Sequence, residues 1–480
     1  MPARDGLVHE VANFAVRAVD AGLPPERRAA TTLAVLDTVG AMALGAVQPI
    51  HSVVDRVARQ WGDDGLATLV GTADRVSTAA AAFVNGTLAH CMDFDDTHLP
   101  SVLHPSASVV PTAFAVAESV DASGPRLLDA VAVGTEVCIR LGMAGYDARL
   151  GNSIFFERGQ HATSICGTVG SAVAAAVLLS EHEDIVASAA GIAASMGSGL
   201  LEANRTGGTV KRVHAGWAAH CGVAAAQLAC AGITGPPTVL EGRFGFFQAF
   251  CGDQADPGVV VSELGVNWHS DSLHVKPYPC NHFTHAGIDA ALELRRRGVQ
   301  PGQIESLELG VPSPVLRTIG EPAADKAVPA TGYAAQFSGP YTVAAALAGG
   351  GGLGLYMEDF TDDAVKRPEV LALAARVTCV AAPECTAVFP HQFPARLTAR
   401  LRDGSTVTAV FLTNRGGPHR PLTDDEVDLK FMLNTGHAYG RDSANRLAAE
   451  IRGLSTTASA RSVGALLRAW PRTNHQGGSQ

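Results

Sequence analysis

Residues 89–111, AHCMDFDDTHLPSVLHPSASVVP, bring together side chains that accept, donate or hold protons. The segment contains three Asp and three His between two runs rich in Ala, Val and Leu. Carboxylates and imidazoles are costly inside such apolar surroundings unless they are paired or used in chemistry. We therefore favour a functional site here over the alternative, which is a solvated acidic helix end.

A helical conformation would group some of these polar residues. His90, Asp93 and Thr97 have the spacing i, i+3, i+7 and would share one face. Such a helix would end at Pro100, because the residue before a proline is pushed out of the α region. His104 would then follow on a short loop.

The carboxylates and imidazoles of this segment also suit a metal ion such as Mg²⁺, Mn²⁺ or Zn²⁺. The DDxxD motif of prenyl-diphosphate enzymes is not matched, because Asp95-Asp96 is followed by Thr, His and Leu. We therefore favour acid–base chemistry without a metal and keep the metal site as the less favoured alternative.

Two clusters of basic residues follow further along the chain. His161 lies in GQHAT, directly before the apolar segment GTVGSA, where it either caps a helix or faces a site. Lys211, Arg212 and His214 follow a Gly-Gly pair and interrupt two segments that we expect to be buried helices. A charge cluster at such a place favours a site over a solvated surface, because burying unpaired charge is costly.

The segment 276–285, KPYPCNHFTH, is a third cluster. Its two prolines restrict the backbone, so that Lys276 would be held in a defined place. His282 and His285 follow within one helical turn. The stretch 348–354, AGGGGLG, contains GxGxxG matches, but it follows an Ala-rich helical pattern and not the strand that a dinucleotide site requires. We interpret it as a flexible loop.

The composition restricts the class of protein. Of 480 residues, 47% are hydrophobic and 17% are charged, which predicts a large buried core. The net charge of −10 argues against a nucleic-acid surface, which needs a basic patch. Nine Cys without a CxxC pair are typical of reduced thiols. No signal peptide or membrane-spanning run is recognisable, so we expect a cytoplasmic protein that binds neither membrane nor nucleic acid.

Hydrophobic periodicity predicts helix after helix in the first half of the chain. The expected helices cover residues 77–92, 107–120, 126–142, 165–180, 184–201 and 215–231. Several of them are apolar on all sides, which marks them as buried. Gly40 and Gly45 lie in an earlier helix that opens at Pro25, and they predict close contacts between helices.

The pattern changes near residue 271. Expected elements are a helix at 285–297 and strands at 304–311, 376–381 and 396–412, the last with an Asp-Gly turn. Thr423 and Glu426 then form a capping box that starts another helical part.

These patterns together predict a mainly α fold. We expect a large all-helical domain, residues 1–270 completed by 416–472, and an inserted smaller α+β domain at 271–415. The last residues, 473–480, are expected to be a disordered tail.

Five sequence blocks, in this order, resemble the MmgE/PrpD family: HCMDFDDTH, HPSASVVP, KRVHAGWAAH, LEGRFGFF and KPYPCNHFTHAGIDAALEL. The family includes 2-methylcitrate dehydratase, cis-aconitate decarboxylase and iminodisuccinate epimerase. The resemblance extends over residues 5–470. It implies a helical domain with an inserted α+β lid domain, a homodimer, no cofactor, and an active site in the cleft between the two domains.

The resemblance also implies which residues form the site. Matching the motifs places the family's catalytic groups on Asp93, Thr97, His104, His161, Lys211 and Lys276. In the decarboxylase a His follows the lid lysine by five positions, whereas this chain has Asn281 there and His282 next. The motifs do not place the decarboxylase's active-site Tyr. The blocks are therefore closer to the family's broad bacterial majority than to the decarboxylase itself.

The family's reactions share proton transfer at a carbon next to a carboxylate. We therefore expect a cofactor-independent lyase, a dehydratase or decarboxylase, that acts on a small di- or tricarboxylic acid. His104 or His161 would move the proton. Lys211 and Lys276 would bind carboxylates, and Asp93 would orient a catalytic group. Further substrate contacts are assigned to Thr97, His90, Arg212, His282 and His285.

Two other functions remain open. An epimerase of a dicarboxylate such as iminodisuccinate would use the same residues as two bases. A helical binding or scaffold protein that keeps the fold without catalysis is the third possibility, and the intact set of basic and acidic residues argues against it.

Overall fold

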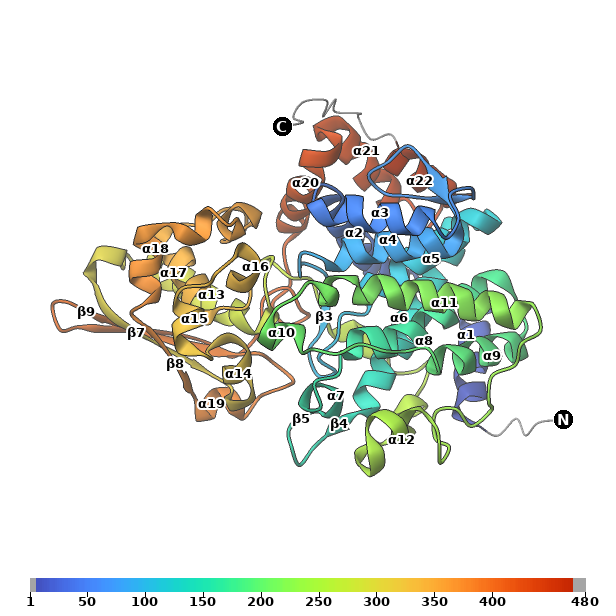
Figure 1. The fold of residues 1–480 in the computed structure, drawn as a ribbon, viewed down its shortest axis with the longest axis horizontal. Helices are drawn as coiled ribbons and strands as arrows, with labels where there is room; N and C mark the ends of the chain where they lie inside the picture. The colour runs from blue at the N-terminus through green and yellow to red at the C-terminus, as the bar shows by residue number, and fades with distance from the viewer. Residues whose placement is uncertain (1–5, 469–480) are drawn as a thin grey trace.

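Helices dominate the structure, as the sequence predicts, and they form a larger and a smaller body (Figure 1). The computed structural model describes residues 6–468, apart from the side chains at 205 and 206, so the predicted tail at 473–480 lies outside the described residues. The long helices of the larger body are α1 (Leu7–Ala21), α2 (Pro25–Ala46), α3 (Pro49–Arg59), α4 (Thr78–His90), α5 (Ser106–Val120), α6 (Gly124–Ala144), α8 (Ala162–Leu179), α9 (Glu183–Ala194), α11 (His214–Cys230), α20 (Asp424–Tyr439), α21 (Arg441–Arg452) and α22 (Arg461–Arg468).

Short elements connect these helices. They are the two-stranded pairs β1 (Ala67–Thr68) with β2 (Arg75–Val76) and β4 (Tyr146–Asp147) with β5 (Asn152–Ser153), and the helices α7 (Ile154–Glu157), α10 (Ala203–Thr206) and α12 (Phe246–Phe250). A 3₁₀ turn, Val210–Val213, leads directly into α11.

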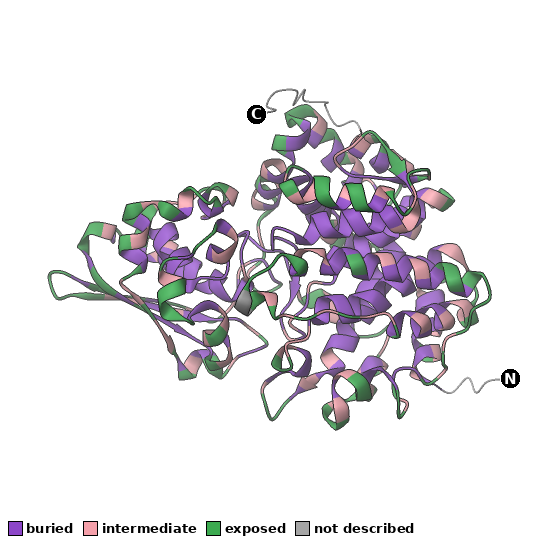
Figure 2. Ribbon diagram, viewed as in Figure 1, coloured by how far each residue is buried: buried purple, intermediate pink, exposed green. Residues whose placement is uncertain are grey.

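The centre of the larger body is α8, whose sequence ATSICGTVGSAVAAAVLL is buried along nearly its whole length (Figure 2). It packs against α5, α6, α9 and α11. Small residues allow these contacts: a Cβ added at Gly134 of α6 would lie 2.7 Å from the carbonyl oxygen of Gly170 in α8. The predicted close contact at Gly45 is confirmed, since a Cβ there would lie 2.2 Å from the carbonyl oxygen of Leu88.

The smaller body contains a four-stranded sheet in the order β10-β9-β7-β8. Its strands are β7 (Ile304–Val311), β8 (Val377–Ala381), β9 (Ala395–Leu401) and β10 (Thr406–Phe411), and only β7 and β8 run parallel. The predicted hairpin is confirmed, with Gly404 of its turn at φ 87°. The helices of this body are α13 (His285–Arg296), α14 (Leu316–Ile319), α15 (Ala323–Ala327), α16 (Gly332–Ala335), α17 (Gly339–Ala348), α18 (Pro368–Ala374) and α19 (Pro383–Thr386).

Each body has its own cluster of buried apolar side chains. The first cluster draws on residues 8–268 and 427–467, and the second on Leu99 and residues 278–409. The sheet and α13 and α17 enclose the second cluster (Figure 1). The chain passes between the bodies near β6 (Leu273–His274) and again before α20, whose predicted capping box is present at Thr423 and Glu426.

A buried ion pair on α6 holds the segment that leads to the first crossing. Arg140 Nε lies 2.8 Å from Glu136 Oε1, and both side chains are fully buried. Arg140 also donates to carbonyl oxygens between residues 259 and 267, while Glu136 accepts from the backbone N–H groups of His269 and Ser270. An irregular backbone can be buried here because its polar groups are satisfied.

One helix is shorter than predicted. The expected helix at 184–201 ends at Ala194, and the chain continues over α8 as MGSGL. Gly197 allows this path, because a Cβ there would lie 2.8 Å from the carbonyl oxygen of Ile165. Gly199 has a φ of 150°, which disfavours any residue with a side chain.

Two helices, α2 and α8, are long and apolar enough to cross a membrane by length and composition alone. In the structure, 83% and 94% of their most apolar windows are buried by the rest of the chain, as in the core helices of a globular protein. The nine cysteines all lie within the described residues, and none forms a disulfide.

Candidate active site

The segment that carries the central acidic residues is a turn and not a helix. The helical alternative for residues 89–99 is wrong: α4 ends at His90, and Thr97 and His98 form a short strand, β3. Asp93 has a φ of 54°, a left-handed conformation that is uncommon for residues other than Gly. Two buried lysines bind successive carbonyl oxygens at this point and offset that cost. They are Lys276, on the carbonyl of Asp93, and Lys430, on that of Phe94.

Strand pairing brings Lys276 to this turn. In the antiparallel pair of β3 and β6, Thr97 lies opposite His274. Lys276 follows two residues later and therefore runs beside the residues that precede Thr97. Its Nζ lies 2.6 Å from Asp93 Oδ1 and 2.9 Å from the carbonyl oxygen of Asp93.

Lys211 approaches the same carboxylate from the larger body, with its Nζ 3.7 Å from Asp93 Oδ2. Lys276, Asp93 and Lys211 are all buried, with 0%, 2% and 5% of their surface exposed. Burial by itself would raise the pKa of Asp93, but the ammonium groups of Lys211 and Lys276 hold it well below its usual value. Burial lowers the pKa of Lys211, but the charge and hydrogen bond of Asp93, together with Tyr333 and Asp95, outweigh this effect, so that the pKa is raised. Asp93 and Lys211 are therefore charged at neutral pH.

His104 is held with its proton on one nitrogen. Its Nδ1 lies 2.7 Å from the carbonyl oxygen of Asp96 and 3.2 Å from Thr97 Oγ1. A carbonyl oxygen only accepts hydrogen bonds, so Nδ1 carries the proton and Nε2 has a lone pair. Burial, together with the charge of Lys276, lowers the pKa of His104 to about 3. His104 is thus a neutral imidazole with a fixed tautomer, suited to act as a base at Nε2.

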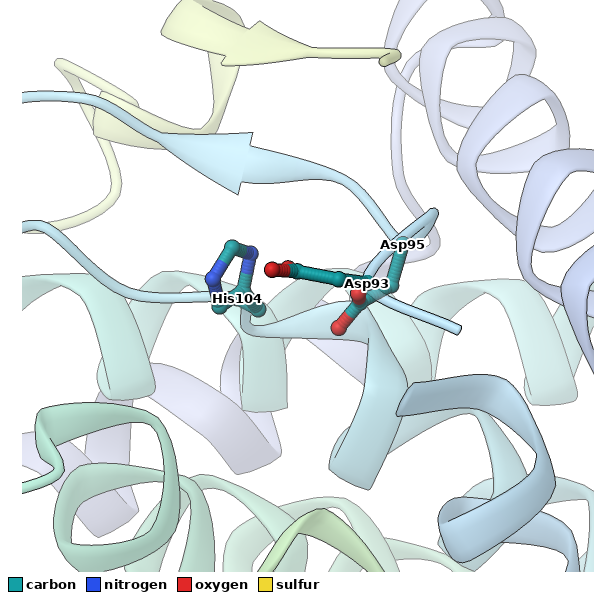
Figure 3. Close-up of side chains that lie close together, drawn as sticks. All are labelled: Asp93, Asp95 and His104. Atoms are coloured by element: carbon teal, nitrogen blue, oxygen red, sulfur yellow. The ribbon is translucent and has the colours of Figure 1, made fainter. Parts of the chain in front are cut away.

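Asp93, Asp95 and His104 converge, with ligand-type atoms of all three within 4.8 Å of one another (Figure 3). Such a group could hold a metal by residue type. However, Asp93 contacts the ammonium groups of Lys211 and Lys276, and Asp95 Oδ2 lies 2.7 Å from His90 Nδ1. The negative charge is thereby largely compensated, so these residues fit an acid–base site better than a divalent cation.

Four histidines contact one another in sequence beside Asp93, in the order His104, His90, His161 and His214. His90 lies between His104 and His161, with ring centroids 5.5 Å from each. His161 is followed by His214, whose Nδ1 lies 2.9 Å from His161 Nδ1. His161 is the residue before α8 and His214 is the first residue of α11, so the two central helices position this pair. The His161 side chain makes no capping hydrogen bond to α8, which excludes the helix-cap interpretation.

The remaining predicted contacts lie at the edge of this group. The guanidinium of Arg212 lies 4.1 Å from the ring centroid of Tyr333. The rings of His282 and His285 are 4.3 Å apart, and His285 Nε2 donates to the carbonyl oxygen of Cys280. Neither ring nitrogen of His282, which is 3% exposed, has a hydrogen-bond partner among residues 6–468.

The smaller body contributes residues that sequence reasoning missed. Gln336 Nε2 donates to the carbonyl oxygens of Met92 and Pro279, at 3.1 and 2.7 Å, and so joins the Asp93 turn to the KPYPC segment. The ring of Phe337 lies 5.3 Å from Lys211 Nζ. Burial raises the pKa of Tyr333, with Lys211 and Asp93 among the charges that act on it. Nothing in the sequence around 333–337 distinguishes these residues from an ordinary helix end.

Lys430 and Asp37 form a second buried pair behind the turn, also missed from the sequence. Lys430 Nζ lies 2.5 Å from Asp37 Oδ1, 3.1 Å from the carbonyl oxygen of Phe94 and 4.0 Å from the centroid of the Phe94 ring. Both side chains are 3% exposed. The sequence does contain a feature that indicates this pair. Asp37 is a single charge within the apolar helix sequence TLAVLDTVGAMAL, and a buried charge requires a partner.

Comparison with known proteins supports the family that the sequence blocks suggest. Residues 9–257 match the MmgE/PrpD N-terminal domain, and residues 278–456 match the MmgE/PrpD C-terminal domain. Cis-aconitate decarboxylase of Homo sapiens is 31% identical over 429 residues, which cover 88% of this chain and 86% of that protein. The enzyme of the same name from Aspergillus terreus is 28% identical over 451 residues, 90% of each chain.

A third relative, the cis-aconitate decarboxylase-like protein oryM of Aspergillus oryzae, is 27% identical over 478 residues, 95% of this chain and 96% of that protein. The relatives thus match over nearly their whole length, and both family domains are present in order. The chain belongs to the MmgE/PrpD family.

Proposed function

We propose that this protein is a cofactor-independent lyase, a dehydratase or decarboxylase, that acts on a small di- or tricarboxylic acid. The observation that carries the proposal is the pair of lysine ammonium groups on Asp93, next to a neutral imidazole with a fixed tautomer. The names of the relatives, several of them cis-aconitate decarboxylases, support a carboxylate substrate.

The proposed chemistry needs a base and positive charge around one carbon. For dehydration, His104 Nε2 takes a proton from the carbon next to a carboxylate, and the hydroxyl on the neighbouring carbon leaves as water with a proton from His161 Nε2. For decarboxylation, CO2 leaves with the bonding electron pair left on the carbon, and that carbon then takes a proton from His161 Nε2. Lys211 and Lys276 bind the substrate carboxylates and stabilise the negative charge that develops. Asp93 contacts both lysine side chains and holds them in place before the substrate arrives.

The other assigned residues surround this centre in the proposal. Thr97 contacts His104 Nδ1 and completes the support of the base. His161 is the second candidate for proton transfer. His90, Arg212, His282 and His285 are proposed to contact the substrate, and the two unpartnered nitrogens of His282 are donors or acceptors that a bound carboxylate would satisfy.

An epimerase remains the second candidate. The observation that favours it is the presence of two imidazoles, His104 and His161, that both flank His90 at ring distances of 5.5 Å. Two bases on one substrate would exchange a proton without loss of CO2 or water. Product mass separates the two functions, because an epimerase leaves it unchanged.

Lys276 and Asp93 are buried, so a substrate reaches them only after part of the surrounding chain has moved. We therefore propose that residues 271–415 act as an α+β lid domain on a helical domain formed by 1–270 and 416–472. We also propose a cytoplasmic homodimer that binds neither nucleic acid nor membrane, in line with the net charge of −10.

A panel of small di- and tricarboxylates, each followed by proton NMR in deuterated water, tests the function. Loss of CO2 or water from one of them supports the lyase. Deuterium incorporation at unchanged carbon skeleton supports the epimerase. A wild-type protein that changes none of the panel would refute both.

A further inference from the structure

His161 and His214 share a hydrogen bond that contains a single proton, which either ring can carry. Their Nδ1 atoms lie 2.9 Å apart, so one Nδ1 carries a proton and the other accepts it with its lone pair. In a pair of neutral imidazoles, the accepting ring must then carry its own proton on Nε2. The two rings therefore have two equivalent arrangements, in which His161 Nε2 is either a base or an acid.

His104 differs in this respect. Its Nδ1 faces the carbonyl oxygen of Asp96 at 2.7 Å, and a carbonyl cannot take over the proton. His104 can accept a proton at Nε2 but cannot pass one on through its ring. Only the His161 ring has a second imidazole behind it.

The position of the pair is fixed by the backbone around it. The backbone N–H of His161 donates to the carbonyl oxygen of Gly199 at 3.0 Å, and Ser164 Oγ donates to the carbonyl oxygen of His214 at 3.1 Å. A Cβ at Gly199 would lie 3.2 Å from His161 Cβ and 3.5 Å from His214 Nδ1. The backbone at Gly199 thus packs closely against both histidines and leaves their rings in contact with each other.

The charged surroundings keep both rings neutral. Lys211, His90 and His104 face the pair, and Lys211 is charged. Burial and then Lys211 lower the pKa of His161 well below its usual value, and burial and then His90 lower the pKa of His214 to about 4. An extra proton on either ring is therefore short-lived, as a relay requires.

We propose that His161 and His214 form a two-imidazole proton relay between the substrate site and the side of α11 where His214 lies. The inference rests on the proposed function, because it names the route by which a proton moves between water and the substrate site. His214 does not contact the substrate in this proposal; it acts through His161.

The proton count balances over one passage. A proton from the site binds His161 Nε2, and the Nδ1 proton of His161 moves to His214 Nδ1. His214 then releases its Nε2 proton to water. Each ring ends neutral with its proton on the other nitrogen, and the reverse passage delivers one proton from water to the site.

Replacement of His214 by Phe removes the relay while keeping an aromatic ring in place. We expect a fall in kcat of about 100-fold and a KM within about twofold of the wild type. His214→Ala instead leaves a space where the ring was, and in that variant we expect the same fall with partial recovery of kcat by added imidazole. His220→Phe is the matched control, since it makes the same change six residues later in α11, where His220 stacks on Trp217. We expect it to retain activity and to show no response to imidazole.

Two results would overturn the relay. One is a His214→Phe enzyme as active as the wild type, and the other is an inactive His214→Ala enzyme that imidazole does not restore, which would indicate a structural role. A wild type without activity on any carboxylate refutes the proposed function instead. In that case ¹⁵N NMR of labelled histidines still tests the relay: the two Nδ1 signals should lie between the protonated and unprotonated extremes, and two signals at the extremes would contradict it.

Discussion

Lys276 Nζ binds both the side chain and the backbone of Asp93, at 2.6 Å from Oδ1 and 2.9 Å from the carbonyl oxygen. One amino group therefore binds both the carboxylate and the left-handed turn that presents it. Because Lys276 enters the site after β6 and Asp93 follows α4, the contact links segments 183 residues apart.

Replacement of Lys276 by Ala should abolish turnover. The variant loses a carboxylate-binding charge and the donor that holds the Asp93 turn, so we expect kcat/KM to fall by about 1,000-fold or more. Lys211 still pairs with Asp93, so the far-UV circular dichroism should be unchanged. Lys366→Ala is the matched control, because that lysine is 69% exposed in its pair with Asp363. Full activity of the Lys276 variant would remove this residue from the proposed site.

Replacement of His104 by Asn should also abolish turnover. An Asn side chain can still donate to the carbonyl oxygen of Asp96, but it offers no basic nitrogen at the position of Nε2. We expect a loss of at least about 100-fold in kcat, with binding of a carboxylate inhibitor, measured by calorimetry, within a few-fold of the wild type. If His104→Asn retains most of its kcat, the base is another residue.

The Lys430–Asp37 pair should be costly to break from one side only. Lys430→Met leaves Asp37 buried and unpaired, and we expect a loss of about 3–5 kcal/mol in the free energy of unfolding. The double variant Asp37→Leu/Lys430→Met removes both charges and should lose less than Lys430→Met alone. Urea denaturation of the wild type, both single variants and the double variant completes the cycle. A double variant that is less stable than both single variants would contradict this explanation.

The contribution of Asp96 to the free energy of unfolding should become smaller as the pH rises. Burial, with the charges of Asp37 and Asp95, raises its pKa to about 7 from 3.8, against the hydrogen bonds from Ser106. Between these two values the folded protein binds more protons than the unfolded chain, so the Asp96 contribution to the free energy of unfolding falls as the pH rises through this window.

Asp96→Asn removes that titration. Relative to the wild type, the variant should gain roughly 3 kcal/mol in the free energy of unfolding between pH 5 and pH 8. Denaturation at both pH values measures it, and Asp403→Asn, a change at an exposed turn, is the control. An Asp96→Asn curve parallel to that of the wild type would show that Asp96 ionises normally.

Local patterns predicted the regular elements well. The strand expected at 304–311 is β7, and the capping box at Thr423 starts α20, because alternation and capping are properties of neighbouring residues. Periodicity failed at residues 91–96, where tertiary contacts decide the conformation. No local pattern indicates that two lysines, 183 and 336 residues away, bind the carbonyl oxygens of Asp93 and Phe94.

The residues of the candidate site, too, were predictable only in part. Residue type and motif grouped Asp93, His104, His161 and the two lysines, and the structure brings them together. Motifs did not indicate Gln336, whose role depends on reaching two carbonyl oxygens from a different body. The partner of His161 was visible as His214 in the sequence, but a contact between the ends of two helices has no signature in either one.

The bond from Lys430 to the carbonyl oxygen of Phe94 spans 336 residues and reaches back from α20. During synthesis, the acidic turn therefore lacks this anchor until α20 has been made. A chain that ends before α20 can assemble α4, α8 and α11 and can bind Asp93 through Lys276, but the carbonyl oxygen of Phe94 then lacks its lysine donor. The turn that carries Asp93 and Phe94 would thus gain its second lysine contact only after α20 has packed against the larger body.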